Sequence, residues 1–141
     1  MPNKLRTYLV EDNPTIRDNL IATLEDLAEV VTIGYAETET AAKSWLRSNE
    51  DSWDLAIVDI FLQEGSGLGV LEHLQQRGKH QHLVVLSNYS TPSIRDRCTQ
   101  LGADRVFDKS QDIDALIDFC VEYAQHGTPP PRQSGRSNWV V

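Results

Sequence analysis

The sequence has 141 residues, about the length of one globular domain, and its 40% hydrophobic and 24% charged residues are ordinary for a folded protein. These values exclude the collagen-like, intrinsically disordered and disulfide-scaffold classes. Acidic residues outnumber basic ones by 21 to 13, and the net charge of −8 argues against direct binding to nucleic acid or to an anionic membrane surface.

Five short apolar runs alternate with amphipathic stretches along the chain. The runs are rich in β-branched residues and too short for buried helices, so they predict strands, and the stretches between them predict helices. The strands are expected, in chain order, at residues 5–10, 30–35, 54–59, 82–87 and 105–108. A helix is expected after each of them.

Several residues have the chemistry of helix ends. Asn13 and Thr91 are each followed by proline, and this pair is typical of an N-cap and a first helical residue. Gly102 is expected to end the helix that Thr91 begins. Ser110 is the expected N-cap of the last helix.

The alternation of strands and helices predicts the α/β class, with a doubly wound, five-stranded parallel sheet covered by helices on both faces. The continuous apolar runs at residues 55–58 and 83–86 agree with strands that are buried on both sides. Right-handed crossovers then bring the carboxyl ends of all five strands to one edge of the sheet, where ligands of such folds bind.

Residues 1–126 are expected to form one domain, and residues 127–141 a proline-rich, disordered tail. Its last three residues, from Trp139, are interpreted as an incidental apolar end rather than a docking peptide. No apolar run approaches the roughly 20 residues of a membrane span, and no signal peptide is evident, so we expect a cytoplasmic protein. Cys98 and Cys120 lie on apolar helical stripes and are predicted to be buried thiols.

Polar side chains follow four of the five predicted strands. Glu11 and Asp12 follow the first strand, Asp59 ends the third, Ser87 ends the fourth and Lys109 follows the fifth. Each acidic residue alone could be a turn or capping residue, but four suitable residue types at four strand ends are unlikely to coincide by chance. Clustered carboxylates favour a hard cation such as Mg²⁺, and an ammonium and a hydroxyl suit phosphoryl oxygens. A carboxylate in this setting can act as a nucleophile toward phosphorus.

This constellation resembles that of two-component response-regulator receiver domains, from about residue 5 to residue 124. The motifs that carry the resemblance are Glu11-Asp12, the run 54–59, Gly65-Ser66-Gly67-Leu68, Leu86-Ser87 and Phe107-Asp108-Lys109. The resemblance implies a flavodoxin-like fold with the strand order 2-1-3-4-5.

The resemblance also implies a role for each residue at the strand ends. Asp59 would accept a phosphoryl group from a histidine kinase or a histidine phosphotransfer protein, and Ser87 and Lys109 would bind the phosphoryl oxygens. The domain would catalyse only its own phosphorylation and dephosphorylation and would not otherwise be an enzyme.

The same resemblance implies a Mg²⁺ cofactor. Asp12, Asp59 and the backbone carbonyl of Phe61 would bind the ion directly, and Glu11 would act mainly through water.

The sequence departs from the family pattern at several positions. Ser110 stands where receivers commonly have a proline with a cis bond, and Val106 stands where they have an aromatic switch residue. Phe107 is expected to point to the opposite face of its strand. We hypothesise that Phe61 and Tyr89 shield the acyl phosphate from water, although both could equally be surface residues without a kinetic role.

About 15 residues follow the last predicted helix, too few for an effector domain, so we expect a stand-alone receiver like the chemotaxis regulator. Its output would be a phosphorylation-dependent interface with an unidentified protein partner, or a phosphoryl relay. One alternative is a binding module that acts without phosphorylation. Another is a Mg²⁺-dependent phosphohydrolase with an aspartyl nucleophile, but Phe61 stands where that class has its second aspartate.

Overall fold

The computed structural model describes residues 4–88 and 91–130, and strands and helices alternate throughout them. The elements are β1 (Leu5–Val10), α1 (Pro14–Leu27), β2 (Val30–Ala36), α2 (Glu39–Ser48), β3 (Leu55–Val58), α3 (Gly67–His73), the short 3₁₀ helix η1 (Leu74–Gln76), β4 (His82–Ser87), α4 (Pro92–Gln100), β5 (Arg105–Asp108) and α5 (Ile113–His126).

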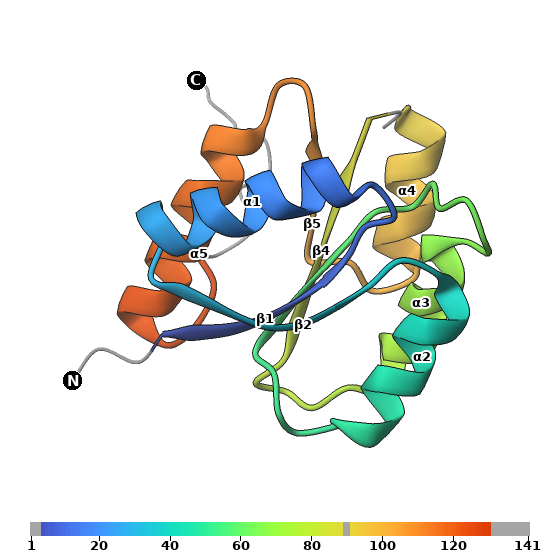
Figure 1. Cartoon of the computed structure of the whole chain (residues 1–141), viewed down its shortest axis with the longest axis horizontal. Coiled ribbons are helices and arrows are strands. Elements are labelled where there is room, and N and C mark those ends of the chain that lie inside the picture. The colour runs from blue at the N-terminus through green and yellow to red at the C-terminus, as the bar shows by residue number, and fades with distance from the viewer. Residues whose placement is uncertain (1–3, 89–90, 131–141) are drawn as a thin grey trace.

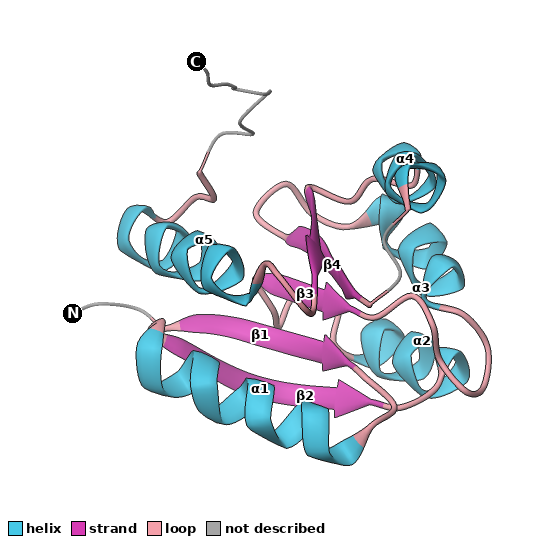
Figure 2. Cartoon of the chain, turned by 90° about the horizontal axis from the view of Figure 1, so that it is seen from above, coloured by secondary structure: helices cyan, strands magenta, loops and turns pink. Residues whose placement is uncertain are grey.

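The five strands form one parallel sheet in the order β2-β1-β3-β4-β5, which confirms the predicted flavodoxin-like fold. Helices α1 and α5 cover one face of the sheet, and α2, α3 and α4 cover the other (Figure 1). The arrowheads of β1, β2 and β3 point to the same edge (Figure 2). This edge is where the sequence predicts the polar residues.

The sheet separates two hydrophobic clusters. Ala56 and Val58 of β3 pack under α2, α3 and α4, whereas Leu55 and Ile57 pack under α1 and α5. All four side chains are buried, because β3 has a strand on each side and helices above and below. The continuous apolar run at residues 55–58 is therefore explained by burial on two faces.

The predicted helix starts at Asn13 and Thr91 are confirmed. The Asn13 side chain accepts a hydrogen bond from the backbone N–H of Ile16, and the Thr91 side chain accepts one from Ile94. Gly102 has a φ of +97°, a left-handed conformation that favours glycine, just after α4. Cys98 and Cys120 are buried free thiols, as predicted.

The predicted N-cap at Ser110 is wrong. Helix α5 begins at Ile113, and Asp112 is its N-cap. The Ser110 amide and hydroxyl both donate to Oδ1 of Asp108, so this serine closes a turn after β5 instead. The Asp112 side chain accepts a hydrogen bond from the Asp108 amide, which holds the other side of the same turn. The Lys109–Ser110 peptide bond is trans.

Two predicted strands differ from the observed ones, the third by one residue at each end and the second by one residue at its end. Strand β3 excludes Asp54, whose carboxylate accepts hydrogen bonds from the backbone amide and the guanidinium of Arg6. It also excludes Asp59, whose side chain belongs to the site described below. Strand β2 extends one residue further than predicted, to Ala36.

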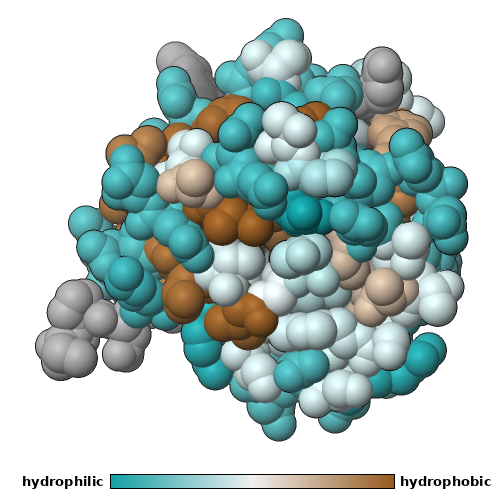
Figure 3. Space-filling view, viewed as in Figure 1, coloured by the Kyte–Doolittle hydropathy of each residue, from teal (hydrophilic) through white to brown (hydrophobic). Residues whose placement is uncertain are grey.

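Hydrophilic and intermediate residues cover most of the face drawn in Figure 3. Hydrophobic residues reach the face drawn in Figure 3 as separate patches among hydrophilic side chains. Four large hydrophobic residues are exposed in the described part of the chain, namely Leu27, Val31, Tyr35 and Phe61. None of the helices in residues 4–88 and 91–130 has the length and apolar content needed to cross a membrane. The end predicted to be a disordered tail lies, from residue 131 onward, outside the described residues.

The buried hydroxyl of Tyr8 leads to a testable prediction about the stability of the core. The Tyr8 ring stacks on that of Trp45 with 4.0 Å between centroids, but its buried hydroxyl has no hydrogen-bond partner among the described residues. Tyr8→Phe is expected to raise the free energy of unfolding by about 1 kcal/mol, because it removes a buried unpaired group and keeps the ring. Urea denaturation measures this change, and a lower midpoint than that of the wild type would contradict it.

The matched control is Tyr123→Phe. The Tyr123 hydroxyl lies 3.0 Å from the carbonyl oxygen of Asp54, 2.9 Å from that of His80 and 3.0 Å from Nδ1 of His82. Removing the hydroxyl leaves each of these three groups with one hydrogen-bond partner fewer. The free energy of unfolding of this variant is therefore expected to fall by about 1 to 2 kcal/mol.

Candidate functional site

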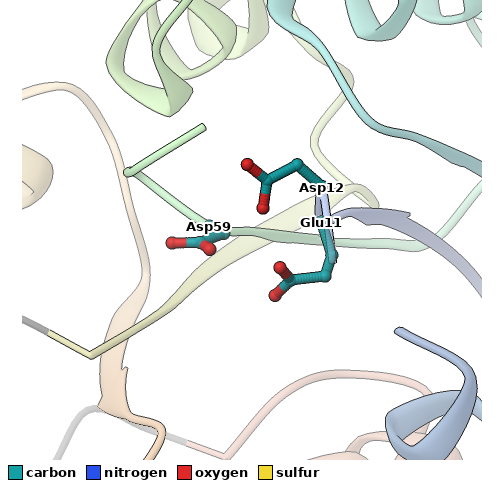
Figure 4. Close-up of side chains that lie close together, drawn as sticks. All are labelled: Glu11, Asp12 and Asp59. Atoms are coloured by element: carbon teal, nitrogen blue, oxygen red, sulfur yellow. The ribbon is translucent and has the colours of Figure 1, made fainter. Parts of the chain in front are cut away.

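Three acidic side chains meet where β1 and β3 end. Val10 pairs with Val58 in the parallel register, so the residues that follow them lie side by side, and the Asp59 amide donates to the Val10 carbonyl at 3.0 Å. One carboxylate oxygen from each of Glu11, Asp12 and Asp59 lies within 4.8 Å of the others (Figure 4). Glu11 is 2% exposed and Asp59 6%.

Lys109 brings a positive charge to this cluster from the end of β5. Its ammonium nitrogen Nζ donates to Oε1 of Glu11 at 2.5 Å and to Oδ2 of Asp59 at 2.9 Å. The Lys109 amide donates to the Ser87 carbonyl, which fixes the residue to the end of β4. The Lys109 side chain is only 10% exposed, so both ion pairs lie away from bulk water.

Burial and charge act against each other in this cluster. Burial raises the pKa of Glu11, and the hydrogen bonds from Lys109 and from the Asn13 amide only partly oppose that change. Burial disfavours the charged form of Lys109, but its hydrogen bonds to Glu11 and Asp59 outweigh this effect and raise the pKa of Lys109. Three ionised carboxylates and one ammonium leave a formal charge of −2. The cluster is therefore short of positive charge.

This donor set fits a hard divalent cation. Carboxylate and carbonyl oxygens are the ligands that Mg²⁺ takes in proteins, and two extra positive charges would balance the formal −2. No nitrogen or sulfur ligand lies within the cluster of Glu11, Asp12 and Asp59.

The loop between β3 and α3 closes the site. The Phe61 amide donates to Oδ1 of Asp59 at 3.1 Å, and the Gln63 amide donates to Oδ2 of Asp12 at 2.7 Å. The Phe61 side chain is 45% exposed. Tyr89, which the sequence analysis paired with Phe61, lies outside the described residues.

The structure thus brings four of the six predicted site residues into one cluster, namely Glu11, Asp12, Asp59 and Lys109. Phe61 adjoins the cluster through its backbone, and Ser87 is fully buried at the end of β4. The Gln63 amide is a partner of Asp12 that the sequence did not predict. A backbone amide has no signature in the sequence, so no sequence pattern could have indicated it.

Val106 and Phe107, which are neighbours in β5, pack on opposite faces of the sheet. Val106 packs, partly buried, against the cluster under α2, α3 and α4. Phe107 is buried in the cluster on the other side of the sheet, where its ring meets that of Phe119 with 5.9 Å between centroids. The prediction that Phe107 points to the opposite face is confirmed.

The family model of the response regulator receiver domain matches residues 8–120. The photosynthetic apparatus regulatory protein RegA of Rhodobacter capsulatus is 26% identical over 123 residues, which are 87% of this chain and 65% of that protein. The uncharacterized transcriptional regulatory protein YvfU of Bacillus subtilis is 28% identical over 115 residues, which are 81% of this chain and 56% of that protein. The chain thus spans less than two thirds of the length of these two relatives.

Solved structures share the fold. The signal receiver domain of the response regulator NarL from Mycobacterium tuberculosis superposes with a TM-score of 0.76 at 20% identity, covering 89% of this chain and 99% of that one. A chain of the CheX–CheY–BeF₃⁻–Mg²⁺ complex from Borrelia burgdorferi gives 0.74 at 16% identity, covering 82% and 86%. The family match extends over most of the chain and the fold agrees with it, so the chain belongs to the response regulator receiver domain family.

Proposed function

We propose that this receiver accepts a phosphoryl group on Asp59, in a Mg²⁺-dependent reaction, from a histidine kinase or a histidine phosphotransfer protein. The proposal rests mainly on the charged groups that surround Asp59. Its carboxylate is buried beside two further carboxylates, and its Oδ2 lies 2.9 Å from the ammonium of Lys109.

Asp59, Lys109 and Ser87 have different roles in the proposed phosphoryl transfer. An oxygen of Asp59 forms a bond to phosphorus while the P–N bond of the donor phosphohistidine breaks, and the imidazole leaves with the electron pair. Lys109 and the Ser87 hydroxyl donate hydrogen bonds to phosphoryl oxygens, which stabilises the charge that spreads over them.

The metal ligands in this proposal are Asp12, Asp59 and the carbonyl of Phe61, with Glu11 acting through water. When bound, Mg²⁺ supplies charge neutralisation at the transferring group. Glu11 keeps the ammonium of Lys109 at the site, since it is that group's second partner.

The output in this proposal is a protein partner or a phosphoryl relay, reached through a surface whose populations phosphorylation shifts. The related structure from Borrelia burgdorferi is of a complex between two proteins, which supports a protein partner. A cytoplasmic location belongs to the same proposal.

Intact-mass measurement after incubation with acetyl phosphate and Mg²⁺ tests the function. The wild type is expected to gain one phosphoryl group, and Asp59→Asn to gain none. Asp54→Asn is the matched control, because Asp54 precedes the same strand that Asp59 follows and lies at the other end of the sheet. An adduct that persists in Asp59→Asn would overturn the assignment, and an unmodified wild type would favour a binding module that acts without phosphorylation.

Phe61 is proposed to slow hydrolysis of the acyl phosphate, together with Tyr89. Phe61 follows Asp59 by two residues, and its half-exposed ring is available to exclude water. Phe61→Ala and Tyr89→Ala are each expected to speed dephosphorylation, followed as loss of the mass adduct after the phosphodonor is removed. Equal lifetimes in both variants and the wild type would show that neither ring shields the phosphate.

A further inference from the structure

The loop of residues 61–66 runs from the site to the start of α3 and is held by two carboxylates that belong to different parts of the protein. At the end near the site, Asp12 accepts a hydrogen bond from the Gln63 amide. At the end near the helix, Glu39 of α2 accepts one from the Ser66 amide at 2.9 Å. The first carboxylate is a proposed metal ligand, whereas the second lies outside the acidic cluster.

Glu39 holds the loop by its backbone as well as by its side chain. Its amide donates to the carbonyl of Glu64 at 3.2 Å, so one residue of α2 binds two residues of the loop. Lys43, one turn along α2, donates to Oε2 of Glu39 at 2.7 Å. The Lys43 and Ser66 hydrogen bonds lower the pKa of Glu39, so the side chain is held as a carboxylate.

Two glycines make room for this carboxylate. A Cβ atom at Gly69, in the first turn of α3, would lie 2.1 Å from Oε2 of Glu39. A Cβ atom at Gly65 would lie 2.4 Å from the Glu39 Cβ, and Gly65 also has a φ of +82°. Neither glycine can therefore gain a side chain while Glu39 keeps its position, and Gly69 does not otherwise need to be glycine, since it sits in a helix.

We infer that Glu39 is a positioning residue of the metal site: it fixes the loop that presents the Phe61 carbonyl and holds the Asp12 carboxylate. The inference rests on the proposed function, which makes these two groups metal ligands. The loop has only six residues, and its amides at Phe61 and Gln63 already contact the carboxylates of Asp59 and Asp12. A shift at Ser66 is therefore transmitted to the site through few bonds.

The test is the dissociation constant of Mg²⁺, measured by titration calorimetry on the full chain without a phosphodonor. Glu39→Ala is expected to weaken Mg²⁺ binding about tenfold, the usual effect of removing a group that supports metal ligands. Glu39→Gln is expected to keep most of the affinity, because its amide oxygen can still accept the Ser66 hydrogen bond.

Gly69→Ala separates positioning from stability. Its new Cβ displaces the Glu39 carboxylate, so Mg²⁺ binding is expected to weaken about as much as in Glu39→Ala. Alanine also favours a helix over glycine, so thermal unfolding is not expected to show a matching loss. Asp54→Ala is the control for stability alone, because it breaks the Arg6 pair at the opposite end of the sheet and should leave Mg²⁺ binding unchanged.

Wild-type Mg²⁺ affinity in both Glu39→Ala and Gly69→Ala would overturn the inference, and so would weakened affinity in Asp54→Ala. Labelling of the wild type with acetyl phosphate is run alongside. If the wild type is labelled but its Mg²⁺ affinity does not depend on Glu39, only this inference fails. If the wild type binds Mg²⁺ but is not labelled, the proposed function fails.

Discussion

Lys109→Met is expected to abolish labelling of Asp59 and to lower the free energy of unfolding by about 3–5 kcal/mol at neutral pH without Mg²⁺. The reason is the burial of its partners. Lys109 is the cation bound to both Glu11 and Asp59, whose side chains are 3% and 8% exposed. Removing the ammonium leaves two buried carboxylates without their compensating charge.

Urea denaturation in EDTA and in saturating Mg²⁺ checks this result. If the cluster binds Mg²⁺, the ion replaces part of the missing charge, so the variant should gain more stability from Mg²⁺ than the wild type does. Lys43→Met is the matched control. Its partner Glu39 is about a quarter exposed and lies on the same helix, so the loss of that pair should cost about 0.5 kcal/mol. Similar losses in the two variants would contradict the account of Lys109.

The strands and the helix starts were predictable because each depends on a short stretch of sequence, whereas the strand order was implied only by the resemblance to receiver domains. The run at residues 55–58 is apolar at every position because β3 is buried on both faces. Asn13 and Thr91 cap helices through side chains that reach amides three residues away. Such signals can be recognised from a few neighbouring residues.

Ser110 shows where this reasoning fails. Serine is a good N-cap, but here the Ser110 amide and hydroxyl donate to the carboxylate of Asp108, and Asp112 occupies the N-cap position of α5 without a side-chain capping hydrogen bond. Ser110 and Asp112 could each stand at the start of the last helix, and the sequence does not reveal which of the two competing turns is more stable.

The site was predictable in its carboxylates but not in the contacts that hold them. Glu11, Asp12 and Asp59 follow apolar strands, and a parallel sheet brings strand ends together. The roles of Glu39 and Gly69 depend on how α2 packs beside α3, which is a tertiary contact without a local pattern. Glu39 read alone is an acidic residue in the first turn of a helix, a common and unremarkable position.

Gly67 is the glycine at which an added methyl group should destabilise the fold most. A Cβ atom there would lie 2.1 Å from the Asp59 carbonyl oxygen and 2.7 Å from the Ile60 Cα. Both are backbone atoms, so no side-chain rotation relieves the overlap. The Gly67 amide also donates to the Ile60 carbonyl, which ties the start of α3 to the end of β3.

Gly67→Ala is therefore expected to lower the free energy of unfolding by about 3 kcal/mol, the upper end of the usual cost of overpacking. Because the backbone that must move carries the Asp59 carboxylate, labelling by acetyl phosphate should also slow in the fraction that stays folded. Gly78→Ala is the control, since its Cβ would meet only side-chain atoms, the ring of His80 at 3.2 Å and Oε1 of Gln81 at 3.6 Å, and the His80 ring can turn away. Equal stability and equal labelling in the two variants would contradict this prediction. That outcome would mean that α3 can move away from Asp59 at little cost in free energy, so that the close packing of Gly67 has no part in positioning the acceptor.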